Sequence, residues 1–231
     1  MTPGILAISV IFMLIGMLVQ ARLKSKFKQY GEVPTSSGLS GKEVAEKMLR
    51  DNGIYDVQVV SVPGFLSDHY DPTKKTVNLS PEVFDGRNIS AAAVSAHECG
   101  HAVQHATAYP MLMLRSRLVP ITQISTNLSQ WVILAGLGVM GFGGGSQSIL
   151  LFGIILFAVS TLFSIITLPV EFDASARALK WLNTANITRA QEHEKAKDAL
   201  KWAALTYVVA ALSSVTMLVY YIMIYSSRDR D

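Results

Sequence analysis

Long apolar runs are the feature that most constrains how this 231-residue chain can fold. Residues 149–170 are almost entirely apolar, and residues 4–20 and 203–225 form two further runs of this kind. About 20 apolar residues in helical form are enough to cross the hydrocarbon core of a bilayer. A fourth segment, 122–142, becomes increasingly apolar towards its end. We therefore predict a mainly α, multi-pass membrane protein with about four transmembrane helices.

The composition agrees with membrane insertion. Hydrophobic residues make up 50% of the sequence and charged residues only 16%. The net charge of +3 is too small to indicate a nucleic-acid partner, so the lipid bilayer is the expected surroundings. The single cysteine, Cys99, excludes an internal disulfide, and we expect it to be a small buried residue.

The basic residues indicate how the chain is oriented. Four of them lie within residues 22–28, directly after the first apolar run, and none precedes that run. This order is typical of an uncleaved anchor, whereas a signal peptide carries its charges first. The connection between the second and third apolar segments is uncharged. We therefore expect a plasma-membrane protein whose residues 22–121 and 171–202 are cytoplasmic.

Two serine or threonine residues stand where helices are expected to begin. Ser40 and Glu43 have the spacing of a capping box, which predicts a helix at 42–52. Thr188 and Gln191 have the same spacing before the last, charged-then-apolar helix.

Strand patterns appear between residues 57 and 79. Residues 57–62 and 76–79 are rich in β-branched side chains and are predicted to be strands. Residues 68–72, DHYDP, are predicted to open a turn between them. Residues 22–121 are therefore expected to form a small cytoplasmic α+β portion.

Residues 97–101 match the pattern H-E-x-x-H. Residues four apart lie on one face of a helix, so His97 and His101 can bind one metal ion. Glu98 then lies beside the metal, within reach of a metal-activated water. The motif therefore predicts a zinc-dependent hydrolytic site.

The residues around this motif favour a helix. Ser90 is the predicted N-cap, with Ile89 and Val94 as a hydrophobic staple around it, and many alanines follow. Gly100 costs about 1 kcal/mol in a helix interior relative to alanine. We therefore expect Gly100 to pack closely against another backbone beside the metal.

A hydrolytic zinc site requires a third protein ligand. His105 is on the same helix face, but three histidines at four-residue steps extend over about 12 Å, too far to converge on one ion. The remaining candidates are His69, Glu171, Asp173 and His193. Glu171 ends a long apolar run, where a carboxylate needs a partner such as Zn²⁺. A helix N-terminal charge explains its position equally well.

Several motifs taken together resemble a known family. HECGHAVQH is preceded by DHYDP and LSPEVF, and PVEFDASARA follows after an apolar run. This combination resembles the YugP-type bacterial membrane zinc metallopeptidases over essentially the whole chain. It is more distantly similar to the membrane gluzincins of the HtpX and CAAX prenyl protease group.

The resemblance implies a membrane zinc endopeptidase with a zincin-like portion. One Zn²⁺ would be held by His97, His101 and Glu171, with Glu98 as general base and a peptide or protein as substrate. In the wider group the helix of the third ligand continues E-x-x-x-D. Here the fourth residue after Glu171 is Ser175, so the sequence departs from that pattern.

Two points stay open from the sequence alone. A second donor to the developing oxyanion is expected among His69, Arg177 and His193. The alternative function is a membrane scaffold or adaptor with a structural zinc site, although such a site has no need of a base like Glu98.

Overall fold

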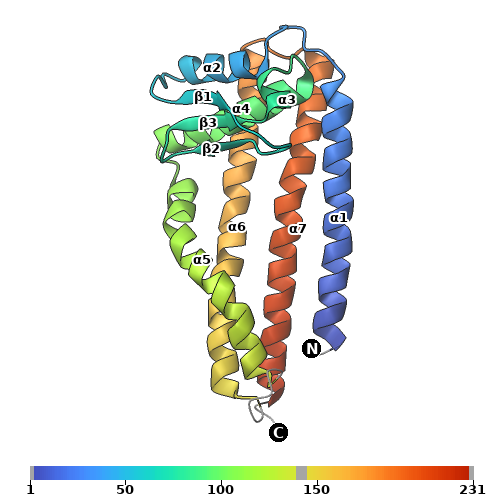
Figure 1. The fold of residues 1–231 in the computed structure, drawn as a ribbon, viewed down its shortest axis with the longest axis vertical. Helices are drawn as coiled ribbons and strands as arrows, with labels where there is room; N and C mark the ends of the chain where they lie inside the picture. Colours follow the sequence, from blue (N-terminus) through green and yellow to red (C-terminus); the bar gives the residue numbers. More distant parts are fainter. Residues whose placement is uncertain (1–2, 139–144, 229–231) are drawn as a thin grey trace. The chain divides into compact units, whose positions relative to one another are not determined.

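The computed structural model describes residues 3–138 and 145–228. The described chain is mainly helical and contains a small sheet, as predicted (Figure 1). Its elements are α1 (Pro3–Gly31), α2 (Gly41–Asp51), β1 (Gln58–Ser61), β2 (His69–Asp71), β3 (Thr76–Leu79), α3 (Pro81–Phe84), α4 (Ile89–Ala106), α5 (Pro110–Gly136), α6 (Gln147–Thr184) and α7 (Ala190–Arg228).

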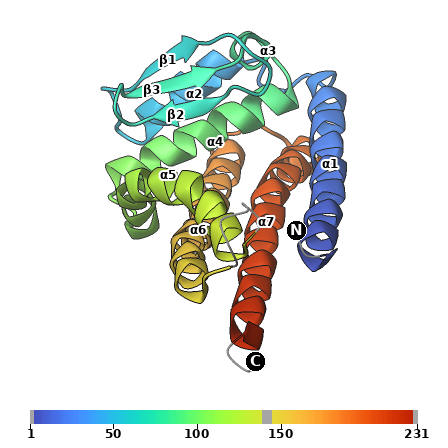
Figure 2. The ribbon, with the colours of Figure 1, turned by 60° about the horizontal axis from the view of Figure 1, so that its bottom comes forward.

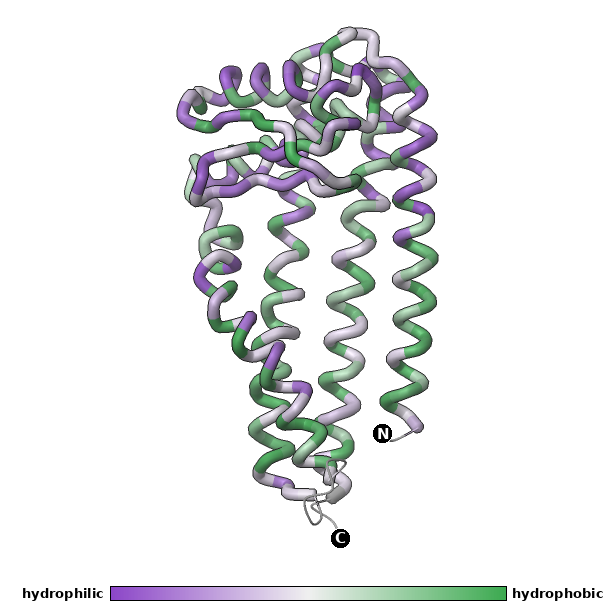
Figure 3. Tube along the Cα trace, in the orientation of Figure 1, coloured by the Kyte–Doolittle hydropathy of each residue, from purple (hydrophilic) through white to green (hydrophobic). Residues whose placement is uncertain are grey.

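Three helices within the described residues, α1, α6 and α7, are long and apolar enough to cross a membrane. Large apolar side chains such as Leu18 and Phe152 are exposed on them, as expected for surfaces in contact with lipid. Figure 3 shows this hydrophobic colouring most clearly along α1 and the first half of α6. The fourth predicted span, 122–142, overlaps α5, which carries Pro120 and is not among these three helices. Residues 139–142 of that prediction lie outside the described residues.

The chain forms two compact units. Within the described residues, the helical unit comprises residues 3–18, 114–138, 145–168 and 206–228. The α+β unit comprises residues 19–113 and 169–205. The boundary within α6 falls at Pro169, which lacks the N–H that would continue the helical hydrogen bonds.

In the helical unit, α5 packs against α6 through small and hydroxyl-bearing residues. A Cβ on Gly136 would lie 2.5 Å from the backbone of Leu150, so only glycine allows this approach. The Thr126 and Ser160 hydroxyls are hydrogen-bonded at 2.7 Å. Close backbone approach and hydroxyl pairs are typical of helices packed without a hydrophobic driving force.

The sheet in the α+β unit has the order β1-β3-β2, with β1 parallel and β2 antiparallel to β3. The predicted strands at 57–62 and 76–79 are confirmed as β1 and β3. The turn expected to open at 68–72 is present at residues 72–75, but the strand β2 (His69–Asp71) directly before it was not predicted. In this turn the Asp71 carboxylate accepts hydrogen bonds from the backbone N–H groups of Thr73 and Lys74 at 2.9 and 3.0 Å.

The capping box before α2 is confirmed. The Ser40 hydroxyl accepts from the Glu43 backbone N–H, and the Glu43 carboxylate accepts from the Ser40 N–H at 2.7 Å. Helices α2 and α4 pack against each other and against the sheet (Figure 2), burying Met48 and Cys99 among others. Cys99 is fully buried, as predicted, and burial raises the pKa of its thiol.

The second predicted capping box, Thr188 with Gln191, is wrong by one residue. Helix α7 begins at Ala190, and the Glu192 carboxylate accepts from the Arg189 backbone N–H at 2.9 Å. Glu192 also accepts from the Ser36 N–H at 3.0 Å, a tertiary contact that the local pattern cannot indicate.

Candidate metal centre

Helix α4 begins at Ile89, and the predicted N-cap Ser90 is wrong. Asn88 is the N-cap, because its side chain accepts from the Ala91 N–H at 2.9 Å. Ser90 lies in the first turn, where its buried hydroxyl donates to the Phe27 carbonyl oxygen at 2.8 Å. The staple predicted around a Ser90 cap fails with it. The helix itself is confirmed and continues to Ala106.

Helix α4 presents both motif histidines on one face. The rings of His97 and His101 have centroids 4.8 Å apart and are nearly perpendicular, at 82°. His101 and Glu98 are both only 8% exposed, so the motif points into the unit and away from solvent.

Gly100 brings α4 into direct contact with the backbone of α6. A Cβ at this position would lie 2.6 Å from the Ala174 carbonyl oxygen, closer than real Cβ contacts come. The predicted close packing of Gly100 against another backbone is thereby confirmed. Glu171 lies three residues before Ala174, so this contact places Glu171 beside the motif.

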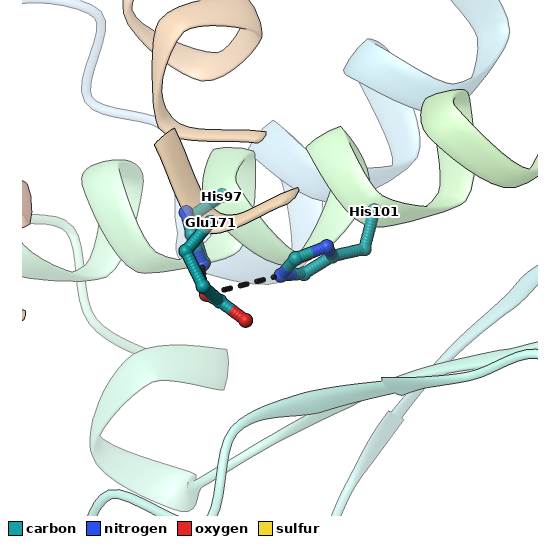
Figure 4. A group of neighbouring side chains, drawn as sticks. All are labelled: His97, His101 and Glu171. Carbon is teal, nitrogen blue, oxygen red and sulfur yellow. Dashed lines mark ion pairs between the residues drawn. The ribbon is translucent and has the colours of Figure 1, made fainter. Parts of the chain in front are cut away.

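The Glu171 carboxylate lies between the two motif histidines (Figure 4). Its Oε2 is 3.4 Å from His97 Nε2 and 3.6 Å from His101 Nε2. Ligand-type atoms of the three residues all lie within 4.8 Å of one another. Glu171 is a carboxylate that is only 2% exposed, directly after an apolar stretch. The three side chains form a group that could hold one metal ion.

The arrangement fits zinc. Donor atoms about 2.0–2.1 Å from a tetrahedral zinc ion lie about 3.3 Å apart, close to the two measured separations. Two imidazoles and one carboxylate also form the donor set of several hydrolytic zinc sites. Burial by itself would lower the pKa of His101, but the Glu171 hydrogen bond and the charges of Glu98 and Glu171 raise it. This electronegative environment favours a cation.

Each histidine of the group has a partner on its other ring nitrogen. The Ser175 hydroxyl lies 3.1 Å from His97 Nδ1, so serine occupies the position where the wider group has aspartate. The Gln104 Oε1 lies 3.0 Å from His101 Nδ1. Sequence reasoning missed Gln104, although its place three residues after His101 on one helix face was a usable signal.

Asp173 does not belong to the group of three. Its carboxylate Oδ2 instead accepts two hydrogen bonds, from Gln104 Nε2 at 2.8 Å and from Arg177 Nε at 2.5 Å. The Arg177 guanidinium carbon also lies 5.8 Å from the centre of the Tyr109 ring. Asp173 therefore contacts the group only indirectly, through Gln104, which in turn bonds to His101.

The other candidate histidines lie elsewhere in the α+β unit. His105 Nδ1 is 3.4 Å from the Tyr70 hydroxyl, and the exposed His69 bonds through Nδ1 to the Ser67 carbonyl oxygen at 2.8 Å. His193 Nδ1 is 3.5 Å from the Thr188 hydroxyl. None of these three histidines is a member of the group around Glu171.

Glu98 is the third ionisable residue of the H-E-x-x-H motif. Within the described part of the chain it forms no hydrogen bond or ion pair. Its charge acts on two neighbours: it helps to raise the pKa of His101, and it adds to burial in raising the pKa of Asp68. A buried carboxylate next to a metal-type group is suited to accept a proton from water.

A helix carrying H-E-x-x-H, completed by a glutamate from a second helix, is the kind of site found in zinc-dependent hydrolases. The comparisons with known proteins agree. Residues 5–226 match the family model described as "Putative neutral zinc metallopeptidase". The chain is 42% identical over 213 residues, 92% of each chain, to "Putative membrane protease YugP" of Bacillus subtilis (strain 168). No solved structure matches. The chain therefore belongs to this family of zinc metallopeptidases.

Proposed function

We propose that this chain is a membrane-embedded zinc-dependent endopeptidase whose single Zn²⁺ is held by His97, His101 and Glu171. The observation that carries the proposal is the convergence of α6 and α4, which sets Glu171 Oε2 3.4 and 3.6 Å from the two histidines. Family membership and a relative named as a membrane protease support peptide bonds as the substrate.

Zinc, when bound, would supply a Lewis acid that lowers the pKa of water towards ~7 and polarises a carbonyl group. Glu98 is the general base in this proposal. Its carboxylate takes the proton from the attacking water and passes it to the nitrogen of the leaving amine. Glu171 would offset one unit of the positive charge of the zinc ion. Ser175 and Gln104 hold the two imidazole rings through their contacts with Nδ1 of His97 and Nδ1 of His101.

We place the site on the cytoplasmic side of the plasma membrane. The support is the group of four basic residues at 22–28, near the end of α1, because short cytoplasmic segments next to spans are enriched in Lys and Arg. Peptide or protein substrates would then be reached from the cytoplasm or from the membrane surface.

The alternative, a scaffold or adaptor with a structural zinc site, is less well supported. Structural sites are usually closed by four protein ligands. The group around Glu171 has three members, and Glu98 stands beside it without a hydrogen-bonded partner in the described residues. An open position with a nearby base favours hydrolysis.

Substitution of Glu98 by glutamine tests this function. Metal content and hydrolysis of a quenched peptide would be measured on the same detergent-purified preparations of wild type, Glu98→Gln and a matched control, Glu82→Gln. Glu82 is exposed on α3 and has no role in the site. We expect Glu98→Gln to keep about one zinc per chain and to lose roughly 10²–10⁴-fold in rate. Near wild-type hydrolysis in Glu98→Gln would refute the general-base role and the peptidase mechanism.

A further inference from the structure

We propose that Gln104 is a positioning residue for His101: its carboxamide sets which ring nitrogen of His101 carries the proton and where the other nitrogen points. This inference rests on the proposed zinc site and deepens it. It comes from three hydrogen bonds of one fully buried side chain with residues of α4 and α6.

The orientation of the Gln104 amide is determined by two acceptors. Its nitrogen lies 2.7 Å from the Val170 carbonyl oxygen and 2.8 Å from the Asp173 carboxylate. Neither a carbonyl nor a carboxylate oxygen can donate, so the NH₂ end of the amide must face both. A flipped amide would place oxygen against oxygen twice, and the orientation is therefore unique.

The oxygen end of the same amide lies 3.0 Å from His101 Nδ1. An amide oxygen only accepts, so Nδ1 must be the protonated nitrogen of His101. The lone pair then lies on Nε2, the nitrogen that faces Glu171 at 3.6 Å. Gln104 thus presents His101 in the form that a metal ion requires.

Glutamine suits this position for a chemical reason. The residue at 104 must donate twice on one side and accept on the other, which a carboxylate or an apolar side chain cannot do. Asp173, the anchor on the donating side, is itself held by Arg177 one turn further along α6. Helix α6 therefore sets Glu171 directly and His101 through Gln104.

His97 provides an internal contrast. Its Nδ1 partner is the Ser175 hydroxyl at 3.1 Å, which can either donate or accept. Ser175 therefore supports the ring of His97 without dictating its protonated nitrogen. Loss of Gln104 should consequently weaken metal binding more than loss of Ser175.

The affinity for zinc alone tests the role of Gln104. Full-length chain in detergent would be titrated in competition with a chelator, comparing wild type, Gln104→Met, Asp173→Ala and the double variant. Gln58→Met, on the exposed end of β1, is the matched control. We expect Gln104→Met to weaken zinc binding ~10–100-fold, the range seen when such supporting partners are removed. Wild-type affinity in Gln104→Met would overturn the inference.

The double variant separates positioning from a general structural role. If Asp173 acts through Gln104, removing Asp173 should have no further effect on zinc binding once Gln104 is methionine. Two independent structural losses would instead add. An additive result would overturn the role of Asp173 as the anchor.

A spectroscopic measurement on wild type needs no variant to fold. The chain has five histidines, so ¹⁵N spectra of histidine-labelled, zinc-loaded protein are simple enough to assign. We expect His101 to carry its proton on Nδ1, protected from exchange by Gln104, and to lose that protection in Gln104→Met. Zinc on Nδ1 of His101 would overturn the inference and leave the peptidase proposal intact. Failure of wild type to bind zinc would instead refute the proposed function.

Discussion

Gly100 of α4 lies against the backbone of Ala174 in α6, so closely that a Cβ would stand 2.6 Å from the Ala174 carbonyl oxygen. The two helices meet without a side chain between them. This contact sets the separation between the H-E-x-x-H motif and Glu171, and the geometry of the whole group depends on it.

Gly100→Ala should therefore damage the site although alanine is the better helix former by about 1 kcal/mol. The added methyl group must push α4 away from α6. Overpacking of this kind typically costs about 1–3 kcal/mol in the free energy of unfolding, and zinc affinity should fall with it. Denaturant unfolding and zinc content would measure both effects.

Gly16→Ala is the matched control, because Gly16 is also in a helix interior and a Cβ there meets nothing within 4 Å. It should leave stability and zinc content unchanged or slightly improved. Unchanged stability and full zinc affinity in Gly100→Ala would mean that the close helix contact is not what sets the site.

Ser175 supports His97 and should be replaceable by a carboxylate. Ser175→Ala removes the partner of His97 Nδ1, so we expect zinc affinity to fall ~10-fold, at the low end for such partners. Ser175→Asp restores the E-x-x-x-D spacing and should bind zinc at least as tightly as wild type. Chelator competition measures both, with Ser61→Ala, exposed on β1, as control. Weaker zinc binding in Ser175→Asp than in Ser175→Ala would contradict this account.

The proposed cytoplasmic location of the site is tested by cysteine labelling in intact cells. The native Cys99 is buried and should give little background. A cysteine at Ser146, in the uncharged connection before α6, should react with an impermeant reagent from outside. A cysteine at Lys47, on the exposed face of α2, should react only after permeabilisation. The reverse pattern would place the site outside the cell.

Local patterns predicted the parts of this molecule that depend on neighbouring residues. The spacing of His97 and His101 is a property of one helix, and the Ser40 capping box is a property of one helix end. The cost of a helical glycine indicated the close contact at Gly100. These features need no knowledge of what the rest of the chain does.

Features that depend on contacts with distant segments were harder to predict from the sequence. The position of Glu171 beside α4 had an equally good local explanation, and family resemblance was needed to favour it. Gln104 was missed because two of its partners, Val170 and Asp173, lie more than sixty residues away. Asn88 displaced Ser90 as N-cap because the Ser90 hydroxyl is engaged by α1, which no local pattern reveals.

The central claim is that Glu171, and not a neighbouring acid or histidine, completes the zinc site, and zinc retention against a mild chelator tests it most directly. Glu171→Ala should lose its zinc and all hydrolysis, and Glu171→Gln, nearly isosteric but neutral, should lose zinc less readily. Asp173→Ala and His193→Ala should load about one zinc per chain, even where Asp173→Ala binds it more weakly. An empty site in Asp173→Ala or His193→Ala, with full zinc retention in Glu171→Ala, would contradict the assignment.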